Sequence, residues 1–164
     1  MATTITNATM TVTISENVKL NGVQQGGTNT LTISPINECA KRIVSIPTAE
    51  TGLLGFAAAI ETDLAKSYVA GQFDEDAVVY IRITNKDDTN HCSLTFRNED
   101  SDEFGLKLDK GQSFIYNGDL AAGVVDTMEA DGAAITPGTF ADLVDITALA
   151  DGDVVDLEVF VASL

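Results

Sequence analysis

The chain has 164 residues, of which 45% are hydrophobic. This suits one globular domain over residues 1–164 and is too high for a disordered chain. Its 25 Asp and Glu outnumber its 9 Lys and Arg, for a formal net charge of -16. That excess argues against binding to nucleic acid or to anionic membranes, because phosphate contacts need cations. It fits a protein that must stay soluble, or one that docks on a basic surface.

No stretch of 18 apolar residues occurs, and the start MATTITNATM lacks the cationic and apolar regions of a secretion signal. Neither a membrane span nor a leader is therefore expected. The two cysteines, Cys39 and Cys92, form no C-x-x-C pair, so no zinc or redox motif is predicted. We expect both to be small buried hydrophobic residues in a reducing compartment.

The first part of the chain reads as a strand, a hairpin signal and a second strand. Hydrophobic residues alternate with Thr and Ser over residues 10–15, which is typical of a strand. Asn21-Gly22 is the strongest short hairpin signal. Residues 24–27 read as a flexible loop, and the strand at residues 28–34 is expected to end at Pro35.

Few charges and many Thr residues occur in the first 35 residues. We therefore expect these first 35 residues to form an edge or arm that pairs with a neighbouring subunit, with residues 1–16 as an N-terminal arm or edge strand. Unchanged self-association and partner binding after deletion of residues 1–16 would contradict this hypothesis.

A strand at residues 40–46, stopped by Pro47, is followed by the ambiguous segment 52–60. Its Ala content favours a helix, whereas Gly52, Gly55 and the lack of a clear cap weaken that interpretation. We interpret this segment as a strand that is buried on both faces.

The clearest signal is the block from Val78 to Tyr116. Three or four strands alternate strictly between apolar and polar residues, and acidic turns separate them. The expected core residues of this block are Val79, Ile81, Ile83, Leu94, Phe96, Leu106 and Leu108.

Residues 118–138 are rich in Gly, Ala and Asp and read as a long loop, with a short strand at residues 124–128. Two further strands are predicted at residues 140–149 and 154–161. About eight strands at roughly 10-residue spacing predict an all-β, antiparallel β-sandwich or barrel. Among sandwiches, a jelly-roll-like arrangement best suits eight strands in this length.

No catalytic signature stands out. His91 is the only histidine and precedes Cys92, but strand alternation sends adjacent side chains to opposite faces. Paired carboxylates for glycoside hydrolysis are available among 25 acids. Sugar clefts usually carry aromatic platforms, however, and this chain has no Trp and few Tyr. We predict that the protein is not an enzyme, has no catalytic residues and binds no cofactor.

The acidic turn NEDSDE is a candidate calcium loop, with Asn98, Asp100 and Asp102 as possible oxygen ligands at alternate positions. The EF-hand pattern requires Gly at its sixth position, which is Glu103 here, and Glu at its twelfth, which is Asp109. We therefore favour a solvated hairpin loop over a weak calcium site.

The phrases YIRITNKDDTNHCSLTF and FGLKLDKGQSFIYNGDL, with the ending DLVDITALADGDVVDLEVFVASL, cover much of the chain. Together with LNG and RIVSIP near the start, they make the sequence resemble small β-rich virion proteins of tailed phages that infect marine and freshwater bacteria, including cyanophages. These phrases are strand-and-turn patterns and not active-site signatures.

The resemblance implies a virion structural role, with a capsid decoration or cement protein on the outer shell as the leading interpretation. Such a protein is made in the bacterial cytoplasm, binds the major capsid protein and often forms a homotrimer. The alternative is a tail, fibre or head-appendage component with a host-binding or adaptor role. A host-derived enzyme or carbohydrate-binding module ranks well behind both.

Overall fold

The computed structural model describes residues 6–57, 72–74, 76–100, 102–117 and 140–164. Within these ranges the chain forms thirteen strands and no helix, which confirms the predicted all-β class. The chain divides into two compact units, one of residues up to Glu38 together with Leu164, and one of Cys39–Ser163. The predicted loop at residues 118–138, with its short strand, lies outside the described residues.

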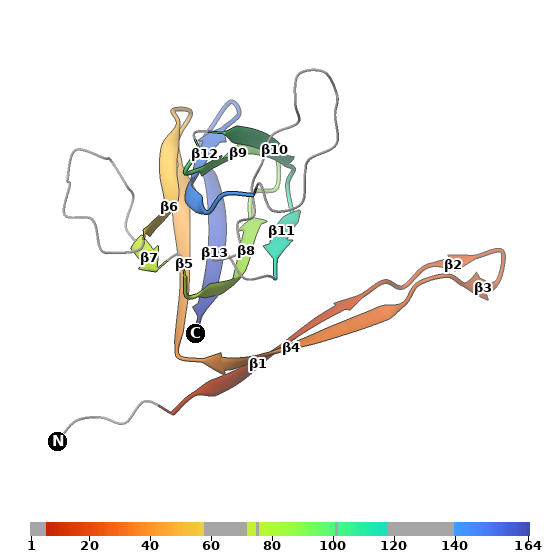
Figure 1. The fold of residues 1–164 in the computed structure, drawn as a ribbon. Helices are drawn as coiled ribbons and strands as arrows, with labels where there is room; N and C mark the ends of the chain where they lie inside the picture. The colour runs from red at the N-terminus through yellow and green to blue at the C-terminus, as the bar shows by residue number, and fades with distance from the viewer. Residues whose placement is uncertain (1–5, 58–71, 75, 101, 118–139) are drawn as a thin grey trace, which may run out of the picture. The chain divides into compact units, whose positions relative to one another are not determined.

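The first unit is a long two-stranded hairpin, called the arm here and drawn in red and orange in Figure 1. Its stem consists of β1 (Ala8–Ser15) and β4 (Thr28–Ile36), and its tip consists of β2 (Lys19–Leu20) and β3 (Val23–Gln24). Both pairs are antiparallel. The expected arm of the first 35 residues corresponds to this hairpin over the described residues, whereas residues 1–16 contain only its strand β1, which pairs with β4.

Two details of the arm differ from the sequence-based expectation. Pro35 lies inside β4, which continues to Ile36. Because β4 pairs on one side only, the missing N–H of proline removes no bond between central strands. Residues 25–27 lie outside the strands, but they are no free loop: Gln25 N–H donates to the Val18 carbonyl, and Glu16 N–H donates to the Gly27 carbonyl, both at 2.8 Å.

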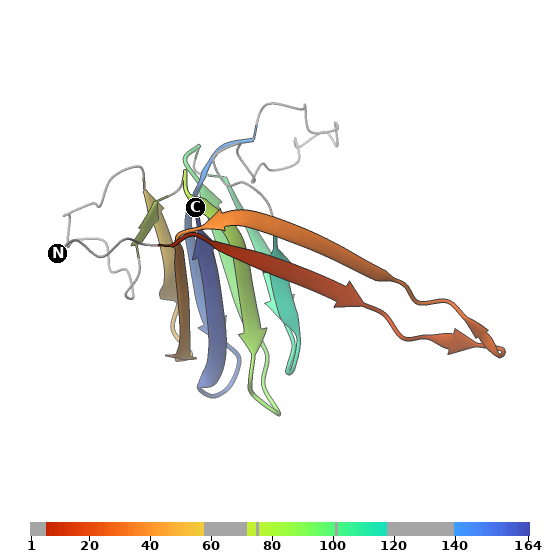
Figure 2. The same cartoon turned by 90° about the horizontal axis from the view of Figure 1, so that it is seen from below.

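The second unit is a β-sandwich of two sheets. The four-stranded sheet has the order β11-β8-β13-β5, and Figure 2 shows these strands side by side. The five-stranded sheet has the order β10-β9-β12-β6-β7. The bounds are β5 Glu38–Ile46, β6 Thr51–Ala57, β7 Gln72–Asp74, β8 Val78–Asn85, β9 Cys92–Asn98, β10 Glu103–Leu108, β11 Ser113–Tyr116, β12 Leu143–Ala150 and β13 Val155–Ser163.

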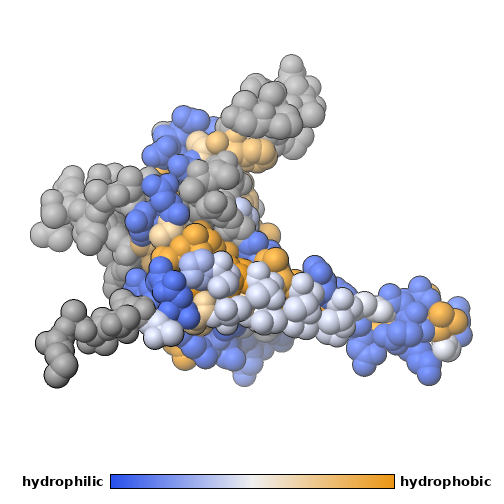
Figure 3. Space-filling model, turned by 60° about the horizontal axis from the view of Figure 1, so that its bottom comes forward, coloured by the Kyte–Doolittle hydropathy of each residue, from blue (hydrophilic) through white to orange (hydrophobic). Residues whose placement is uncertain are grey.

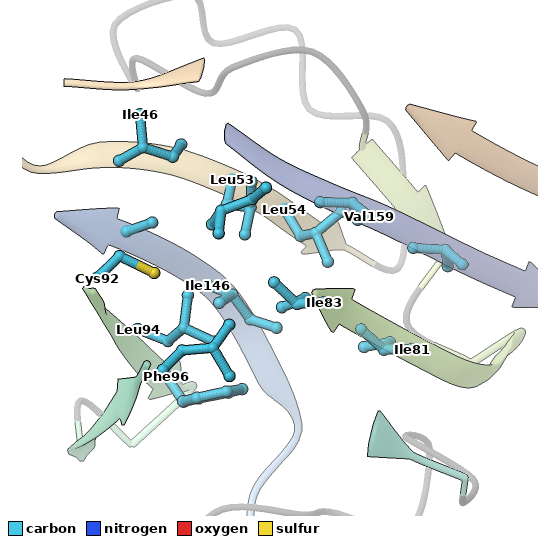
Figure 4. Packing of buried hydrophobic residues seen from close by; sticks show 14 of the residues in the cluster. Ile46, Leu53, Leu54, Ile81, Ile83, Cys92, Leu94, Phe96, Ile146 and Val159 are labelled. Carbon is cyan, nitrogen blue, oxygen red and sulfur yellow. The ribbon is translucent and has the colours of Figure 1, made fainter. Parts of the chain in front are cut away.

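Strand directions agree with the predicted antiparallel sandwich. The pairs β10–β9, β9–β12, β12–β6, β11–β8 and β8–β13 are antiparallel, and the short β7 is parallel to β6. Both sheets contribute side chains to one buried cluster, part of which is shown in Figure 4. The sandwich therefore has its own core, built between its two sheets.

Most of the expected core residues lie in this cluster: Ile81, Ile83, Leu94, Phe96 and Leu108. Leu106 is partly buried and packs against the cluster. Val79 differs, because it is buried but lies outside the cluster, and Val78 takes the core position. The pairing of β8 with β13 is irregular here: Tyr80 pairs with Ala162 and Val78 pairs with Ser163, so Val79 is an extra residue between two paired ones. This β-bulge explains why Val78, and not Val79, takes the core position.

The ambiguous segment at residues 52–60 is a strand as far as the structure describes it. β6 covers Thr51–Ala57, and Leu53, Leu54 and Phe56 all belong to the buried cluster. Leu53 and Leu54 can both reach it because the register shifts here: Leu54 pairs with Ile146 and Gly52 with Thr147, which leaves Leu53 as an extra residue. The expected strand is confirmed, and its burial on both faces stays a prediction. Residues 58–60 lie outside the described residues.

The acidic turn between β8 and β9 is held by one buried amide. Asn85 is fully buried, and its side-chain nitrogen donates to the carbonyls of Asn90 and Leu108 at 3.0 and 3.1 Å. Its side-chain oxygen accepts from Asp87 N–H at 2.9 Å. One side chain thus ties the turn to the end of β10.

Replacing this amide should destabilise the sandwich. We expect Asn85→Ala to lower the free energy of unfolding by about 1–3 kcal/mol, because it leaves buried backbone groups unsatisfied. Urea denaturation measures the change. Asn117→Ala, at an exposed asparagine, is the control and should change stability by less than about 0.5 kcal/mol. Equal effects of both substitutions would contradict this role for Asn85.

Candidate functional site

The arm has two chemically different faces because side chains alternate along its strands. One face is apolar apart from Asn29, which pairs with Ile14, and its apolar residues are Met10, Val12, Ile14, Leu31 and Ile33. Within it, Met10 pairs with Ile33 and Val12 pairs with Leu31. We call these five residues the apolar stem face. Ile14 and Leu31 are 42% and 36% exposed, which is high for large aliphatic side chains.

The opposite face of the stem consists of Thr and Ser side chains, visible as a pale band along the arm in Figure 3. Cross-strand contacts join Thr9 to Ser34 at 3.3 Å and Ser15 to Thr28 at 3.1 Å. Hydroxyl pairs of this kind add modest cross-strand stability and remain compatible with water. The stem is therefore amphipathic, with one face suited to solvent and the other suited to burial.

The tip is the most exposed apolar part of the arm. Val18, Leu20 and Val23 are 52%, 62% and 58% exposed, and Leu20 pairs directly with Val23. Asn21 and Gly22, with φ angles of 50° and 83°, form the turn between them. Two positive φ angles are the requirement of a type I′ hairpin turn, which explains Asn-Gly at this position.

Close packing of the backbone fixes the junction between stem and tip. A Cβ atom added at Gly26 would lie 1.9 Å from the carbonyl oxygen of Glu16. Only glycine leaves room for that carbonyl. The two strands can therefore continue side by side from stem to tip.

An isolated two-stranded hairpin is at best marginally stable in water. An arm that also exposes apolar side chains at its tip and along its stem is typical of a surface that binds a partner. We take the arm as the candidate functional site.

Charge is distributed unevenly between the two units. Residues 1–38 contain only Glu16, Lys19 and Glu38 among the 34 charged residues, so nearly all of the net charge of -16 belongs to residues 39–164. The sandwich is therefore strongly acidic, whereas the arm is almost neutral.

A polar network covers part of the five-stranded sheet on the side away from the core. Arg97 donates to carboxylates of Glu50, Glu103 and Asp145 at 2.6, 3.1 and 3.3 Å, and to the hydroxyl of Thr147 at 3.1 Å. Hydrogen bonding to Glu50 is the largest cause that raises the pKa of Arg97. Hydrogen bonds from Thr147 and then Arg97 lower the pKa of Glu50. One cation thus holds three acids together.

Removing this cation should give a pH-dependent loss of stability. We expect Arg97→Gln to lower the free energy of unfolding by about 1–2 kcal/mol at pH 7, since three carboxylates are then left close together. In the wild type, the lowered pKa of Glu50 adds stability above its unfolded pKa and loses it as pH falls through the folded pKa. In the variant, the neighbouring carboxylates repel one another while charged, so their protonation in acid relieves the repulsion.

The difference in the free energy of unfolding between wild type and Arg97→Gln should therefore become smaller as the pH falls from 7 to about 4. Urea denaturation across this range measures it. Lys107→Gln is the control, because Lys107 forms one exposed ion pair with Asp109 and should change stability by less than about 0.5 kcal/mol. A difference that stays constant or grows in acid would contradict the proposed role of Arg97.

The structure does not bring the three candidate calcium ligands together as a cation site, because the Asn98 side chain is used within its own turn. The Asn98 side chain is buried and closes its own turn: its oxygen accepts from Asp102 N–H at 2.7 Å, and its nitrogen donates to the Asp102 carboxylate at 3.4 Å. Asp100 is exposed. Within the described ranges, no group of three or more His, Cys, Asp or Glu residues could hold a metal ion.

His91 and Cys92 have different environments. The His91 ring lies 3.3 Å from the Asp151 carboxylate, whereas Cys92 is fully buried in the core. Burial raises the pKa of the Cys92 thiol to about 11, so it remains protonated at neutral pH. Cys39 is exposed, so the expectation that both cysteines are buried is wrong for Cys39. It lies at the start of the edge strand β5, where the outer face is open to water.

The sequence predicted the hairpin signal and the alternation of apolar and polar residues along the arm, but not which residues of the two strands lie opposite one another. The register between β1 and β4 shows that the apolar residues of both strands lie on one face of the stem. The Arg97 network was not predicted either, because no local sequence pattern marks partners that are distant along the chain.

No helix in the described part of the chain is long and apolar enough to cross a membrane. Comparison with known proteins adds no relative: no family model matches the sequence, and neither a curated protein nor a solved structure shows significant similarity to it.

Proposed function

We propose that this protein is a structural component of a tailed-phage particle, of the capsid decoration or cement type. In this proposal it binds the outer face of the shell and stabilises contacts between major capsid protein subunits. The strand-and-turn phrases of the sequence suggest this class of protein. The observation that carries the proposal is the arm, whose tip exposes Leu20 and Val23.

A rigid sandwich with an apolar hairpin suits attachment to a repetitive surface. Side chains such as Leu20 and Val23 each gain about 1.5–3 kcal/mol when they become fully buried. That contribution recurs at every copy on a shell, so weak single contacts add up to stable decoration. The acidic sandwich favours a basic shell surface and keeps free copies apart before assembly.

We also infer that the sandwich is jelly-roll-like. Without the three-residue β7, its sheets have the orders β5-β13-β8-β11 and β6-β12-β9-β10. The first strand of the sandwich thus neighbours the last, β6 neighbours β12, β8 neighbours β11, and β9 neighbours β10. This is the arrangement of a long hairpin rolled into two sheets, and it supports the jelly-roll inference.

Copy number in purified particles tests the proposed function. Quantitative mass spectrometry should give a number of copies close to that of the major capsid protein, and the protein should lie on the outer surface of the particle. A value of a dozen or a few dozen copies would instead favour the tail, fibre or appendage alternative. Absence from the particle would reject both.

A further inference from the structure

We propose that Asn21, at the tip of the arm, is a site of spontaneous chemical modification. Deamidation of its side chain converts the turn Asn21-Gly22 into an aspartyl or isoaspartyl turn and thereby weakens attachment through the tip. The modification follows from the turn itself, whereas its effect on attachment rests on the proposed function.

The sequence of the turn supplies both reacting groups. The backbone nitrogen of Gly22 can attack the side-chain carbonyl carbon of Asn21, because glycine has no side chain that obstructs the approach. The surroundings leave this space open as well, since a Cβ atom added at Gly22 would meet no atom within 4 Å. Apart from Asn117, which also precedes a glycine, every other asparagine of the chain precedes a residue with a side chain.

No hydrogen bond restrains these groups within the described residues. Asn21 and Gly22 are exposed, and neither the Asn21 amide nor the Gly22 N–H has a hydrogen-bond partner there. In a turn of this kind the closing N–H belongs to the following residue, here Val23. The tip has only two residue pairs, so the turn can open and rotate into the geometry that the attack requires.

Other asparagines of the chain are held in place. The amides of Asn85 and Asn98 are buried and use their oxygen and nitrogen atoms in hydrogen bonds. Asn17, close to the tip, accepts from the Gln24 side chain at 3.4 Å and precedes a valine. These differences set Asn21 apart from the other asparagines of the arm.

The reaction consumes only water. A bond forms between the Gly22 nitrogen and Cγ of Asn21, and the bond between Cγ and the side-chain nitrogen breaks. Ammonia leaves with the proton that the Gly22 nitrogen gives up, and a cyclic succinimide remains. Water then opens this ring at one of its two carbonyl groups, which gives aspartate or isoaspartate.

Both products change the attachment surface. Each places a carboxylate between Leu20 and Val23, the apolar pair of the tip. Because burial of an unpaired charge is unfavourable, a converted tip should bind at least tenfold more weakly. Isoaspartate also adds Cβ to the main chain, so the turn loses the backbone geometry that joins the two strands of the tip. Copies that stay unattached therefore lose their attachment surface with age.

Peptide mapping of the aged, full-length protein by mass spectrometry tests the modification. An Asn117→Ala background removes the other Asn-Gly pair. Asn21 should gain the mass difference between an amide and a carboxylic acid before Asn17 does. Isoaspartate should appear at position 21, because only the cyclic intermediate yields it. Conversion of Asn21 no faster than that of Asn17, or conversion to aspartate without isoaspartate, would overturn the inference.

Particle binding tests the consequence. Fresh and aged protein are compared by co-sedimentation with particles stripped of this protein. Asn21→Gly is the matched control, because glycine accepts the φ of 50° at this position and has no amide to lose. Binding by the wild type should fall as Asn21 is converted, whereas binding by aged Asn21→Gly should stay within about threefold of its fresh value. Equal losses in both proteins, or converted protein that binds like fresh protein, would contradict the role of Asn21 in attachment.

The outcomes separate this inference from the proposed function. Conversion of Asn21 in a protein that never binds particles, even when fresh, would retain the modification site and reject the proposed function. Fresh protein that binds particles while Asn21 stays intact on ageing would retain the proposed function and reject the modification site.

Discussion

Leu94→Ala should lower the free energy of unfolding of the sandwich by about 3–4 kcal/mol. Leu94 is fully buried in β9, where it pairs with Leu106 on one side and Ala148 on the other. Figure 4 shows its side chain beside Phe96 and Ile146. Removal of the isobutyl group leaves a cavity between two sheets that cannot easily collapse. Urea denaturation monitored by circular dichroism measures the loss.

Leu149→Ala is the matched control for this prediction. Leu149 lies in β12 and is 40% exposed, so the same truncation should lower stability by less than about 1 kcal/mol. A loss under about 0.5 kcal/mol for Leu94→Ala would show that this face of β9 is not part of the core.

Leu20→Ser/Val23→Ser should weaken binding to phage particles by about 100-fold or more. Each apolar side chain contributes about 1.5–3 kcal/mol on full burial, and 1.4 kcal/mol corresponds to a factor of ten in affinity. Co-sedimentation with particles stripped of this protein measures the binding. The stability of the sandwich should not change, because the buried cluster contains no residue of the arm.

Lys19→Ser/Gln24→Ser is the control, because these residues form the adjacent cross-strand pair of the tip. We expect their binding to stay within about threefold of the wild type. Removing residues 1–37 should abolish binding as well. Deleting residues 1–16 alone is a poorer experiment, because it removes β1 and leaves β4 without its partner strand. Equal binding by the tip variant and its control would exclude the tip as the attachment point.

The strands from Val78 to Tyr116 were predictable because each has one buried and one exposed face and because acidic turns separate them. Alternation with a period of two residues is a local signal, so a single sequence contains it. The strand β6 was harder to infer, because an apolar run looks the same in a buried strand and a buried helix. Gly52 and Gly55 disfavoured a helix and so favoured the strand that the structure shows.

The polar networks could not be predicted because their partners are distant in sequence. Arg97 contacts Glu50 and Asp145, which are 47 and 48 positions away. Asn85 reaches the Leu108 carbonyl across 23 positions. Their positions depend on which strands become neighbours, and strand order is a property of the whole fold.

The separation between the arm and the core has an evolutionary consequence. A substitution at Leu20 or Val23 should not impair folding of the sandwich, because neither side chain belongs to the buried cluster. Selection for a stable fold therefore does not act against it. A lineage can therefore exchange the tip for a different short peptide and acquire a new attachment partner in a few mutations. The same property makes the turn at Asn21-Gly22 a suitable place to insert a foreign epitope for display.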